Sequence, residues 1–134
     1  MRQVAAFPFR LTGSTSGPIE VLLVTSIQSK RWIIPKGDID NGMAPHLAAE
    51  KEAFEEGGVR GRISSESIGC FCHQKKLDGA LILTEVDVFP LEVHTELERW
   101  PEDDRRQRRW LALHDAAQQV EEPELGAIIS RFRP

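Results

Sequence analysis

The strongest constraint on the fold is a series of short apolar runs separated by turn-forming residues. The runs are rich in Val, Ile and Phe and comprise Val4–Phe9, Ile19–Ser26, Arg31–Pro35, Ser67–Lys76 and Ala80–Val93. Runs of this length and composition are typical of β-strands. Leu11–Pro18 and Lys76–Ala80 carry the Gly, Ser, Pro and Asp-Gly signals of hairpin connections. The sequence therefore predicts a sheet built largely from hairpins.

Helical periodicity is confined to two segments. The first runs from about Pro45, a favourable first-turn residue, to Glu56, and two glycines follow it as left-handed exits. The second is Leu113–Phe132, which Pro123 splits into a short helix and a terminal amphipathic helix. Strands outnumber helices, and the helices lie between and after the hairpins. We therefore predict an α/β (α+β) fold in which helices cover a mixed β-sheet.

Length and composition limit the class of protein. The chain has 134 residues, 40% of them hydrophobic, and no repeat or linker, so we expect residues 1–134 to form a single domain. A net charge of −4 does not favour nucleic acid or an anionic membrane as a partner. Cys70 and Cys72 lack further cysteines for a zinc site, and the N-terminus has no apolar run of signal-peptide length. We expect free thiols and a cytoplasmic location.

Three glutamates gather on one side of the first predicted helix. At about 100° per residue, Glu52, Glu55 and Glu56 fall within an arc of roughly 100°. Like charges at this spacing repel one another, and a hard divalent cation would reverse the sign of that interaction. Mg²⁺ and Mn²⁺ take oxygen ligands and typically bridge carboxylates to substrate phosphates. The alternative is a solvated acidic face with Lys51 and Arg60 as partners.

The other sides of this helix indicate how it packs. Leu47 and Phe54 lie together opposite the glutamates, so we expect this apolar side to pack. Ala48 and Ala49 border the acidic side and have little bulk. Their small size predicts room for a ligand beside the carboxylates.

The segment from Gly37 to Val59 resembles the Nudix box of the Nudix hydrolase family. The box reads G-x5-E-x7-R-E-U-x-E-E-x-G-U, where U is a bulky apolar residue, and it fits these 23 residues without a gap. The matching positions are Gly37, Glu52, Glu55, Glu56, Gly58 and Val59. "RWIIPKG" before the box and "RRQRRW" after it are similar to members that cleave diphosphoinositol polyphosphates and dinucleoside polyphosphates. The resemblance implies a Nudix-type α/β/α sandwich.

Two positions depart from the box. Met43 stands where the first Glu is expected, and Lys51 stands in place of Arg. In the family these two groups mainly hold the loop and the helix together and orient the glutamates. Lys51 cannot make the planar bidentate contact of Arg, so we expect less firmly oriented glutamates and retained activity.

The resemblance implies a pyrophosphohydrolase that uses Mg²⁺ or Mn²⁺ to hydrolyse a phosphoanhydride bond. Its catalytic residues would be Glu52, Glu55 and Glu56. Glu52 and Glu56 would be the main metal ligands and Glu55 a second or water-mediated ligand, and any of the three could be the catalytic base. Further oxygen ligands could come from four groups: the carbonyl of Lys36 or Gly37, and the carboxylate of Glu85 or Asp87.

A polyphosphate also requires cationic side chains. The candidates are Lys30, Arg31, Lys36, Lys75, Lys76, Arg106 and Arg108. The substrate-binding set that we predict is Arg31, Lys36, Lys30 and Arg108. The alternative roles are solubility at hairpin ends and, for Arg105–Arg109, ion pairing with Glu102–Asp104. The four histidines lack metal-ligand spacing, and Trp32 and Trp110 are expected to pack in the core.

A different class of function remains open, a Nudix-fold module that binds a phosphorylated ligand or protein without cutting it. Met43 and Lys51 favour this reading, whereas the complete E-x-x-E-E set favours catalysis because such glutamates repel one another without a metal ion. A nucleic-acid-binding role for "RRQRRW" is disfavoured by the acidic residues beside it. We expect a phosphorylated small-molecule substrate. Neither its identity, nucleotide or inositol pyrophosphate, nor the oligomeric state follows from the sequence.

Overall fold

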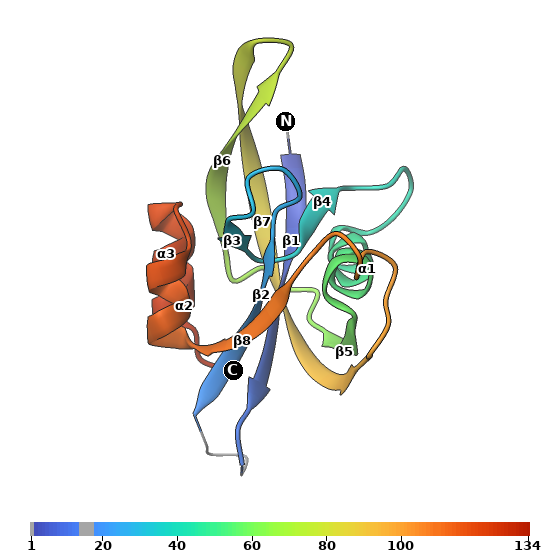
Figure 1. Ribbon diagram of the computed structural model, residues 1–134, viewed down its shortest axis with the longest axis vertical. Helices are drawn as coiled ribbons and strands as arrows, with labels where there is room; N and C mark the ends of the chain where they lie inside the picture. Colours follow the sequence, from blue (N-terminus) through green and yellow to red (C-terminus); the bar gives the residue numbers. More distant parts are fainter. Residues whose placement is uncertain (1, 14–17) are drawn as a thin grey trace.

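The computed structural model describes residues 2–13 and 18–134, and Lys75 by its backbone alone. Its strands are β1 (Arg2–Leu11), β2 (Ile19–Thr25), β3 (Trp32–Ile33), β4 (Lys36–Asp38), β5 (Val59–Ile63), β6 (Gly69–Leu77), β7 (Ala80–Glu96) and β8 (Arg108–Ala112). Its helices are α1 (Pro45–Gly57), α2 (Leu113–Gln119) and α3 (Pro123–Arg131). Helix α1 covers one face of the sheet, and α2 and α3 cover the other (Figure 1). The predicted α/β/α arrangement is confirmed.

The sheet is mixed because its two long strands run parallel. β1 and β7 pair in parallel from Arg2↔Glu85 to Phe9↔Glu92, whereas the other described pairings are antiparallel. β6 and β7 form the predicted hairpin, which closes at Leu77↔Ala80. The pairing of Leu11 with Ile19 supports the first predicted hairpin. Residues 14–17 of that connection lie outside the described residues.

Three strands lie where the sequence did not predict them: β4, β5 and β8. β4 and β5 flank α1 and are short, and β8 occupies the Arg-rich stretch. β8 pairs with β2 from Glu20↔Ala112 to Val24↔Arg108, so a buried neighbour supplies the strand structure that its composition does not. The predicted strand at Arg31–Pro35 is reduced to the two residues of β3.

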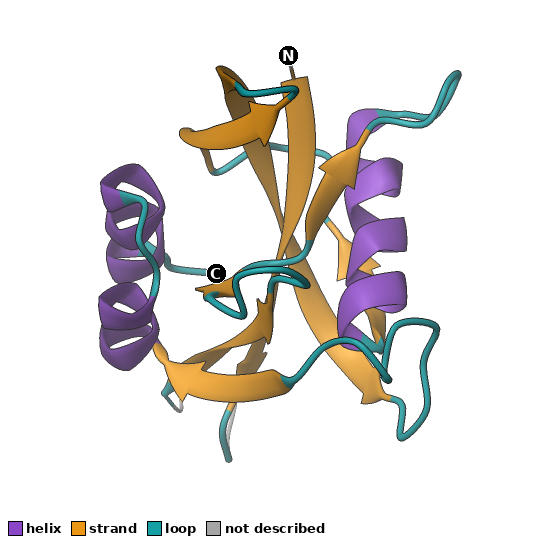
Figure 2. Cartoon of the chain, turned by 45° about the horizontal axis from the view of Figure 1, so that its top comes forward, coloured by secondary structure: helices purple, strands orange, loops and turns teal. Residues whose placement is uncertain are grey.

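Each face of the sheet has its own core, one under α1 and one under α2 and α3, the helices that flank the sheet in Figure 2. On the α3 side, Phe132 lies 4.5 Å from Phe7 and 4.9 Å from Phe9 between ring centres. The core on the α1 side is built from smaller residues, including the alanines of α1. Trp32 packs against the first core and Trp110 against the second, as predicted.

Helix α1 has the predicted bounds but packs with a different side. It ends at Gly58, whose left-handed backbone (φ 65) closes the helix as expected. The prediction that Leu47 faces the core is wrong, because 43% of Leu47 is exposed. Ala48 and Ala49 are instead 1% and 0% exposed, so they leave no space for a ligand. Their small side chains allow a close approach of the helix to the sheet, and this approach buries Glu56.

Two further sequence expectations concern the surface. No helix among the described residues is long and apolar enough to cross a bilayer. Cys70 and Cys72 are exposed free thiols on β6, as predicted. Burial and the nearby Asp87 raise the pKa of the Cys70 thiol, which disfavours a reactive thiolate.

Candidate active site

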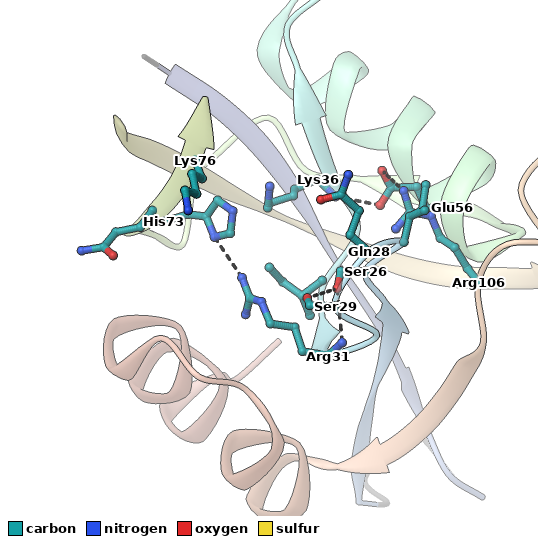
Figure 3. A pocket seen from close by; sticks show the side chains of 12 residues that line it. Ser26, Gln28, Ser29, Arg31, Lys36, Glu56, His73, Lys76 and Arg106 are labelled. Atoms are coloured by element: carbon teal, nitrogen blue, oxygen red, sulfur yellow. Dashed lines mark hydrogen bonds and ion pairs between the residues drawn. The ribbon is translucent and has the colours of Figure 1, made fainter. Parts of the chain in front are cut away.

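Glu56 is the most deeply buried of the three glutamates, and both of its carboxylate oxygens have partners. Its exposed fraction is 6%. Oε1 accepts a hydrogen bond from the backbone N–H of Lys36 at 3.2 Å, and Oε2 lies 3.3 Å from Nη2 of Arg106. Lys36 begins β4 and Arg106 precedes β8 (Figure 3). The carboxyl group therefore joins α1 to two segments that are distant in sequence.

Glu52 lies one turn earlier on α1 and is in contact with both Glu56 and Gly37. The two carboxyl groups are hydrogen-bonded to each other. A Cβ atom added at Gly37 would fall 2.5 Å from Cδ and 2.6 Å from Oε2 of Glu52. A side chain here would displace the Glu52 carboxyl group, and its absence lets β4 lie directly against that group.

Burial shifts the titration of both carboxyl groups. It raises the pKa of Glu56 to about 8, although Arg106 and the N–H of Lys36 act in the opposite direction. Burial also raises the pKa of Glu52, and the hydrogen bond from Glu56 partly offsets this rise. Burial therefore favours the neutral form of Glu56, and the hydrogen bond between the two carboxyl groups is one in which they share a proton. Charging both groups at once requires a cation between them.

Glu55 has a different partner. Its Oε2 lies 3.8 Å from Nζ of Lys51, which is 2.6 Å from Oδ2 of Asp40. The hydrogen bond to Asp40 and the charge of Glu55 raise the pKa of Lys51. Within the described residues, no three acidic, His or Cys side chains converge closely enough to hold a metal ion. The structure thus brings Glu52 and Glu56 together and leaves Glu55 beside them with Lys51.

The donor chemistry of the Glu52–Glu56 pair fits Mg²⁺ or Mn²⁺. In proteins, Mg²⁺ usually takes one or two carboxylates and keeps water or substrate phosphate oxygens as its remaining ligands. The pair supplies two carboxyl groups that now share a proton. Gly37 keeps side-chain atoms away from Glu52 on the β4 side. At a two-carboxylate site of this kind, water or substrate phosphate oxygens would complete the coordination.

A cavity of about 570 Å³ opens beside Glu56. Its wall contains four cationic side chains and one acidic one: Arg31, Lys36, Lys76, Arg106 and Glu56. Glu56 and Arg106 lie at one end, Arg31 and Lys76 at the other, and Lys36 between them (Figure 3). Of the predicted substrate-binding set, Arg31 and Lys36 therefore line the cavity. The side chain of Lys75 lies outside the described residues.

Arg31 is fixed in this wall by a cluster of polar side chains. Its Nη1 and Nη2 lie 3.2 and 2.8 Å from the carboxylate oxygens of Glu122, and Nη2 lies 3.1 Å from Nδ1 of His73. Burial lowers the pKa of His73. Burial opposes ionisation of Glu122 as well, but the hydrogen bonds from Arg31 and His73 hold its pKa below the ordinary value. The cluster therefore joins Arg31 to β6 and to the start of α3.

The other two predicted cations lie outside the cavity. Lys30 has a left-handed backbone (φ 57) and lines a neighbouring space of about 470 Å³ with Trp32. Arg108 contacts the end of α1, where Nη1 donates to the carbonyl oxygen of Gly57 at 2.9 Å. Its guanidinium also lies 3.8 Å from the ring centre of Trp100. Arg108 thus satisfies a free carbonyl of the helix C-terminus.

The two β7 carboxylates that were considered as further ligands are paired with another residue. Oε2 of Glu85 lies 3.4 Å from Nη1 of Arg2, and Oδ2 of Asp87 lies close to Nη2 of the same side chain. These ion pairs tie the start of β1 to β7, beside the register pair Arg2↔Glu85.

Sequence reasoning undervalued three residues of the site: Arg106, His73 and Glu122. Arg106 was a candidate phosphate contact, with pairing to its acidic neighbours as the alternative; it does contact Glu102 at 2.7 Å, but it also contacts Glu56. His73 was set aside because the four histidines lack metal-ligand spacing. Its strand position beside the hairpin lysines was the available signal, whereas nothing in the sequence connects Glu122 to Arg31.

Comparisons with known proteins place this chain in a family. Residues 1–132 match the family model of the NUDIX domain. Nudix hydrolase 4 of Arabidopsis thaliana is 35% identical over 118 residues, covering 84% of this chain and 56% of that protein. Diphosphoinositol polyphosphate phosphohydrolase 2 of Rattus norvegicus is 33% identical over 100 residues, covering 72% and 52%. The chain belongs to the Nudix family and spans about half the length of the curated relatives it matches.

Solved structures share the fold at lower identity. A binary complex of C. elegans Ap4A hydrolase has a TM-score of 0.70 at 21% identity, covering 98% of this chain and 93% of that one. The NUDIX domain of Shewanella oneidensis NrtR, complexed with ADP ribose, has a TM-score of 0.69 at 16% identity, covering 98% and 86%. These similarities confirm the predicted Nudix-type fold.

Proposed function

We propose that this protein hydrolyses a phosphoanhydride bond in a polyphosphorylated small molecule with the help of Mg²⁺ or Mn²⁺. The observation that carries the proposal is the hydrogen-bonded Glu52–Glu56 pair at one end of a cavity with four cationic side chains. Paired carboxylates attract a divalent cation, and the cations attract the phosphates of a substrate. Residues 1–134 would act together as one Nudix domain.

In this proposal Glu52 and Glu56 hold the metal ion, and Glu55 is a third, more distant carboxylate. A bound divalent cation would acidify a water molecule and neutralise charge on the phosphate oxygens. Glu55 is partly exposed, and its carboxylate lies 3.8 Å from Nζ of Lys51. The backbone of Lys36 and Gly37 lies against the two buried glutamates and could add a carbonyl ligand.

The cavity wall supports recognition of the substrate through its phosphates. The ammonium group of Lys36, which donates to Oε1 of Gln3 at 3.1 Å, lies between the two ends of the cavity and would contact the phosphate groups at the cleaved bond. Arg31 and Lys76 would contact phosphates further away. The wall residues that the structure describes include no Phe, Tyr or Trp, so no ring of these types is available there to stack on a nucleobase.

The substrate class follows from this chemistry and from the relatives. Two relatives are named for diphosphoinositol polyphosphates and for Ap4A, and a third is bound to ADP ribose. We therefore propose a diphosphoinositol polyphosphate, a dinucleoside polyphosphate or another nucleoside diphosphate derivative. A phosphorylated polyol suits the non-aromatic wall best.

A binding module without catalysis is the second candidate. It is favoured by the ion pair between Arg106 and Glu56, which gives the buried carboxyl group a cationic partner within the chain. A domain of this kind would hold a phosphorylated ligand or protein in the same cavity without cutting it.

The deciding experiment measures phosphate release from a substrate panel with Mg²⁺, with Mn²⁺ and without metal. The panel contains diphosphoinositol polyphosphates, dinucleoside polyphosphates, nucleoside diphosphate sugars and nucleoside triphosphates, and a parallel set with pyrophosphatase reveals pyrophosphate release. Glu56→Gln should abolish metal-dependent turnover. Glu50→Gln, on the outer side of the same helix beside Leu47, is the matched control and should retain it. Binding of a panel member without turnover would favour the binding module.

The proposed function includes a cellular location. We propose a cytoplasmic location on the basis of the two free thiols, which fit a reducing compartment. Two relatives are named as chloroplastic and mitochondrial, so imaging of the tagged full-length protein is the appropriate test.

A further inference from the structure

The segment between β7 and β8 is fastened to the end of α1 at several points. The backbone N–H of Glu102 donates to the carbonyl oxygen of Glu55 at 3.1 Å. The indole N–H of Trp100 donates to the carbonyl oxygen of Glu56 at 3.0 Å. This segment therefore holds a defined position relative to the glutamates, although about 45 residues separate the two in sequence.

Arg106 extends from this segment to the Glu56 side chain. Its guanidinium has three partners: Oε2 of Glu56 at 3.3 Å, Oε1 of Glu102 at 2.7 Å and the carbonyl oxygen of Thr25 at 3.0 Å. Its side chain is only 11% exposed. A planar guanidinium with partners on α1, on its own segment and at the end of β2 has little freedom to move.

The contact leaves the Glu56 carboxylate able to bind another group. Each carboxylate oxygen has about two lone-pair sites. Oε1 uses one for the N–H of Lys36, and Oε2 uses one for Arg106. These two donors hold the carboxyl group in place, and the lone pairs that are not used for them or for the proton shared with Glu52 are available for a ligand.

Lys51, the cation of α1 itself, has a different orientation. Its ammonium group lies 2.6 Å from Asp40 and 3.8 Å from Glu55. Among the described residues it forms no ion pair with Glu52 or Glu56. The orientation of the buried glutamate therefore depends on a residue outside the helix.

We propose that Arg106 is a positioning residue that orients the Glu56 carboxylate for metal binding, a task that Lys51 does not perform. The proposal rests on the proposed function insofar as Glu56 is taken to be a metal ligand. Residues that orient a metal ligand typically contribute roughly tenfold to hundredfold in metal affinity or activity. Arg106 is predicted to contribute within this range, and Lys51 is predicted to contribute little.

The first test is a titration of the purified protein with Mn²⁺, in which the electron paramagnetic resonance signal of free Mn²⁺ reports binding without any substrate. Arg106→Ala should raise the Mn²⁺ dissociation constant by about tenfold or more. Arg105→Ala is the matched control, since Arg105 is the adjacent arginine, its side chain is half exposed, and its ion pairs within the described residues are with Glu102 and Asp104. It should bind Mn²⁺ like the wild type. Equal Mn²⁺ affinity of all three proteins would overturn the proposal.

A second variant allows for the chance that Arg106→Ala does not fold. Arg106→Lys keeps the positive charge, but a single ammonium group cannot reach all three partners at once. It should bind Mn²⁺ more tightly than Arg106→Ala and more weakly than the wild type, with the apo unfolding midpoint near that of the wild type. Wild-type affinity in Arg106→Lys would contradict the need for a guanidinium at this position.

Kinetics separate this proposal from the proposed function. With a substrate found in the panel, Arg106→Ala at saturating Mn²⁺ should lower kcat and leave KM nearly unchanged, because the contact is to Glu56. A rise in KM alone would instead assign Arg106 to substrate binding and overturn the positioning role. If the wild type turns over no panel member, the proposed function fails, while the Mn²⁺ titration still decides the role of Arg106.

Discussion

The two helical layers cover opposite faces of one sheet, and the side chains that they bury differ in size and polarity. Helix α3 buries large apolar residues, namely Leu125, Ile128 and Ile129. Helix α1 buries three alanines, a glycine and one carboxylic acid, namely Ala48, Ala49, Ala53, Gly57 and Glu56. The first layer supplies apolar contact area, which stabilises the fold. The second layer buries less apolar area and brings an acidic group close to the sheet.

Small residues are what make the close approach of α1 possible. A Cβ atom added at Gly57 would lie 3.0 Å from Cδ2 of Leu22 in β2, which is already a tight contact. With so little space between helix and sheet, Glu56 meets the backbone N–H of Lys36 in β4. Helix α3 therefore contributes mainly to stability, whereas α1 places carboxylates next to the sheet.

The strongest test of these different roles is to shorten a buried side chain of α3. Ile129 is 0% exposed, and Ile129→Ala should lower the free energy of unfolding by about 2–5 kcal/mol through lost contacts and a residual cavity. Urea unfolding measures the loss. The Mn²⁺ affinity of the folded fraction should stay at the wild-type value, because the contacts of Ile129 lie on the other face of the sheet.

The matched control for this variant is Ser130→Ala, the adjacent exposed position of α3. It should leave the unfolding midpoint nearly unchanged. A large loss of Mn²⁺ affinity in folded Ile129→Ala would contradict the division of roles between the two layers.

A single methyl group added to β4, where it faces α1, should instead lower Mn²⁺ affinity. Gly37→Ala would place Cβ 2.5 Å from Cδ of Glu52 and displace the carboxyl group. We expect Mn²⁺ affinity and kcat to fall by roughly tenfold to hundredfold, as for other disturbances of ligand orientation. Isothermal titration with Mn²⁺ and the panel assay measure the two quantities.

Gly126→Ala provides the contrasting control in α3. An added Cβ there would meet nothing closer than 3.4 Å, and alanine favours a helix over glycine by up to about 1 kcal/mol. This variant should be slightly more stable and unchanged in Mn²⁺ affinity. If Gly37→Ala binds Mn²⁺ as well as Gly126→Ala does, Glu52 does not need its present position.

The buried acid of α1 also predicts how stability depends on pH. In the unfolded chain Glu56 has the ordinary pKa of 4.5, and in the folded chain its pKa is about 8. Between these values the folded state holds a proton that the unfolded state has released, so the metal-free protein should lose stability as pH rises from about 5 to 8. Unfolding midpoints measured across this range test the direction.

The difference between wild type and Glu56→Gln reports the contribution of Glu56 together with its coupled neighbour Glu52. His73, whose pKa is lowered by burial, contributes a slope of the opposite sign at the acidic end of the range. Because both proteins contain His73, it cancels in the comparison, and the stability advantage of Glu56→Gln should grow with pH. A constant difference between the two proteins would mean that Glu56 is already ionised at pH 5.

The same contrast between layers explains what could be predicted from the sequence. The pattern of α3 is strongly amphipathic, and large residues such as Ile128 can only be accommodated in a core, so its placement follows from periodicity. The bounds of α1 were also readable, since proline and glycine mark its ends. Its rotation was not, because a rule that buries the largest apolar residues selects Leu47 over the alanines.

Some contacts of the candidate site could be predicted from the sequence, and others could not. Glu52 and Glu56 lie one helical turn apart, and Gly37 belongs to the same 23-residue motif, so these residues could be grouped from the sequence. Arg106 contacts Glu56 across 50 residues of sequence, and Arg31 contacts Glu122 across 91. Such pairs depend on which strands become neighbours in the sheet, and β8, which follows Arg106, is a strand that composition did not predict.

The smallest expected effect concerns Lys51, the cation that α1 itself carries. It stands at the motif position where an Arg is expected, yet its ammonium group pairs with Asp40 and Glu55 at the surface. Lys51→Ala should therefore change kcat/KM and Mn²⁺ affinity by less than about threefold, as expected for loss of an exposed ion pair. Panel kinetics and the Mn²⁺ titration measure both. A loss as large as that of Arg106→Ala would mean that Lys51 orients the glutamates. Helix α1 would then position its carboxylates with its own residues and not with the segment before β8.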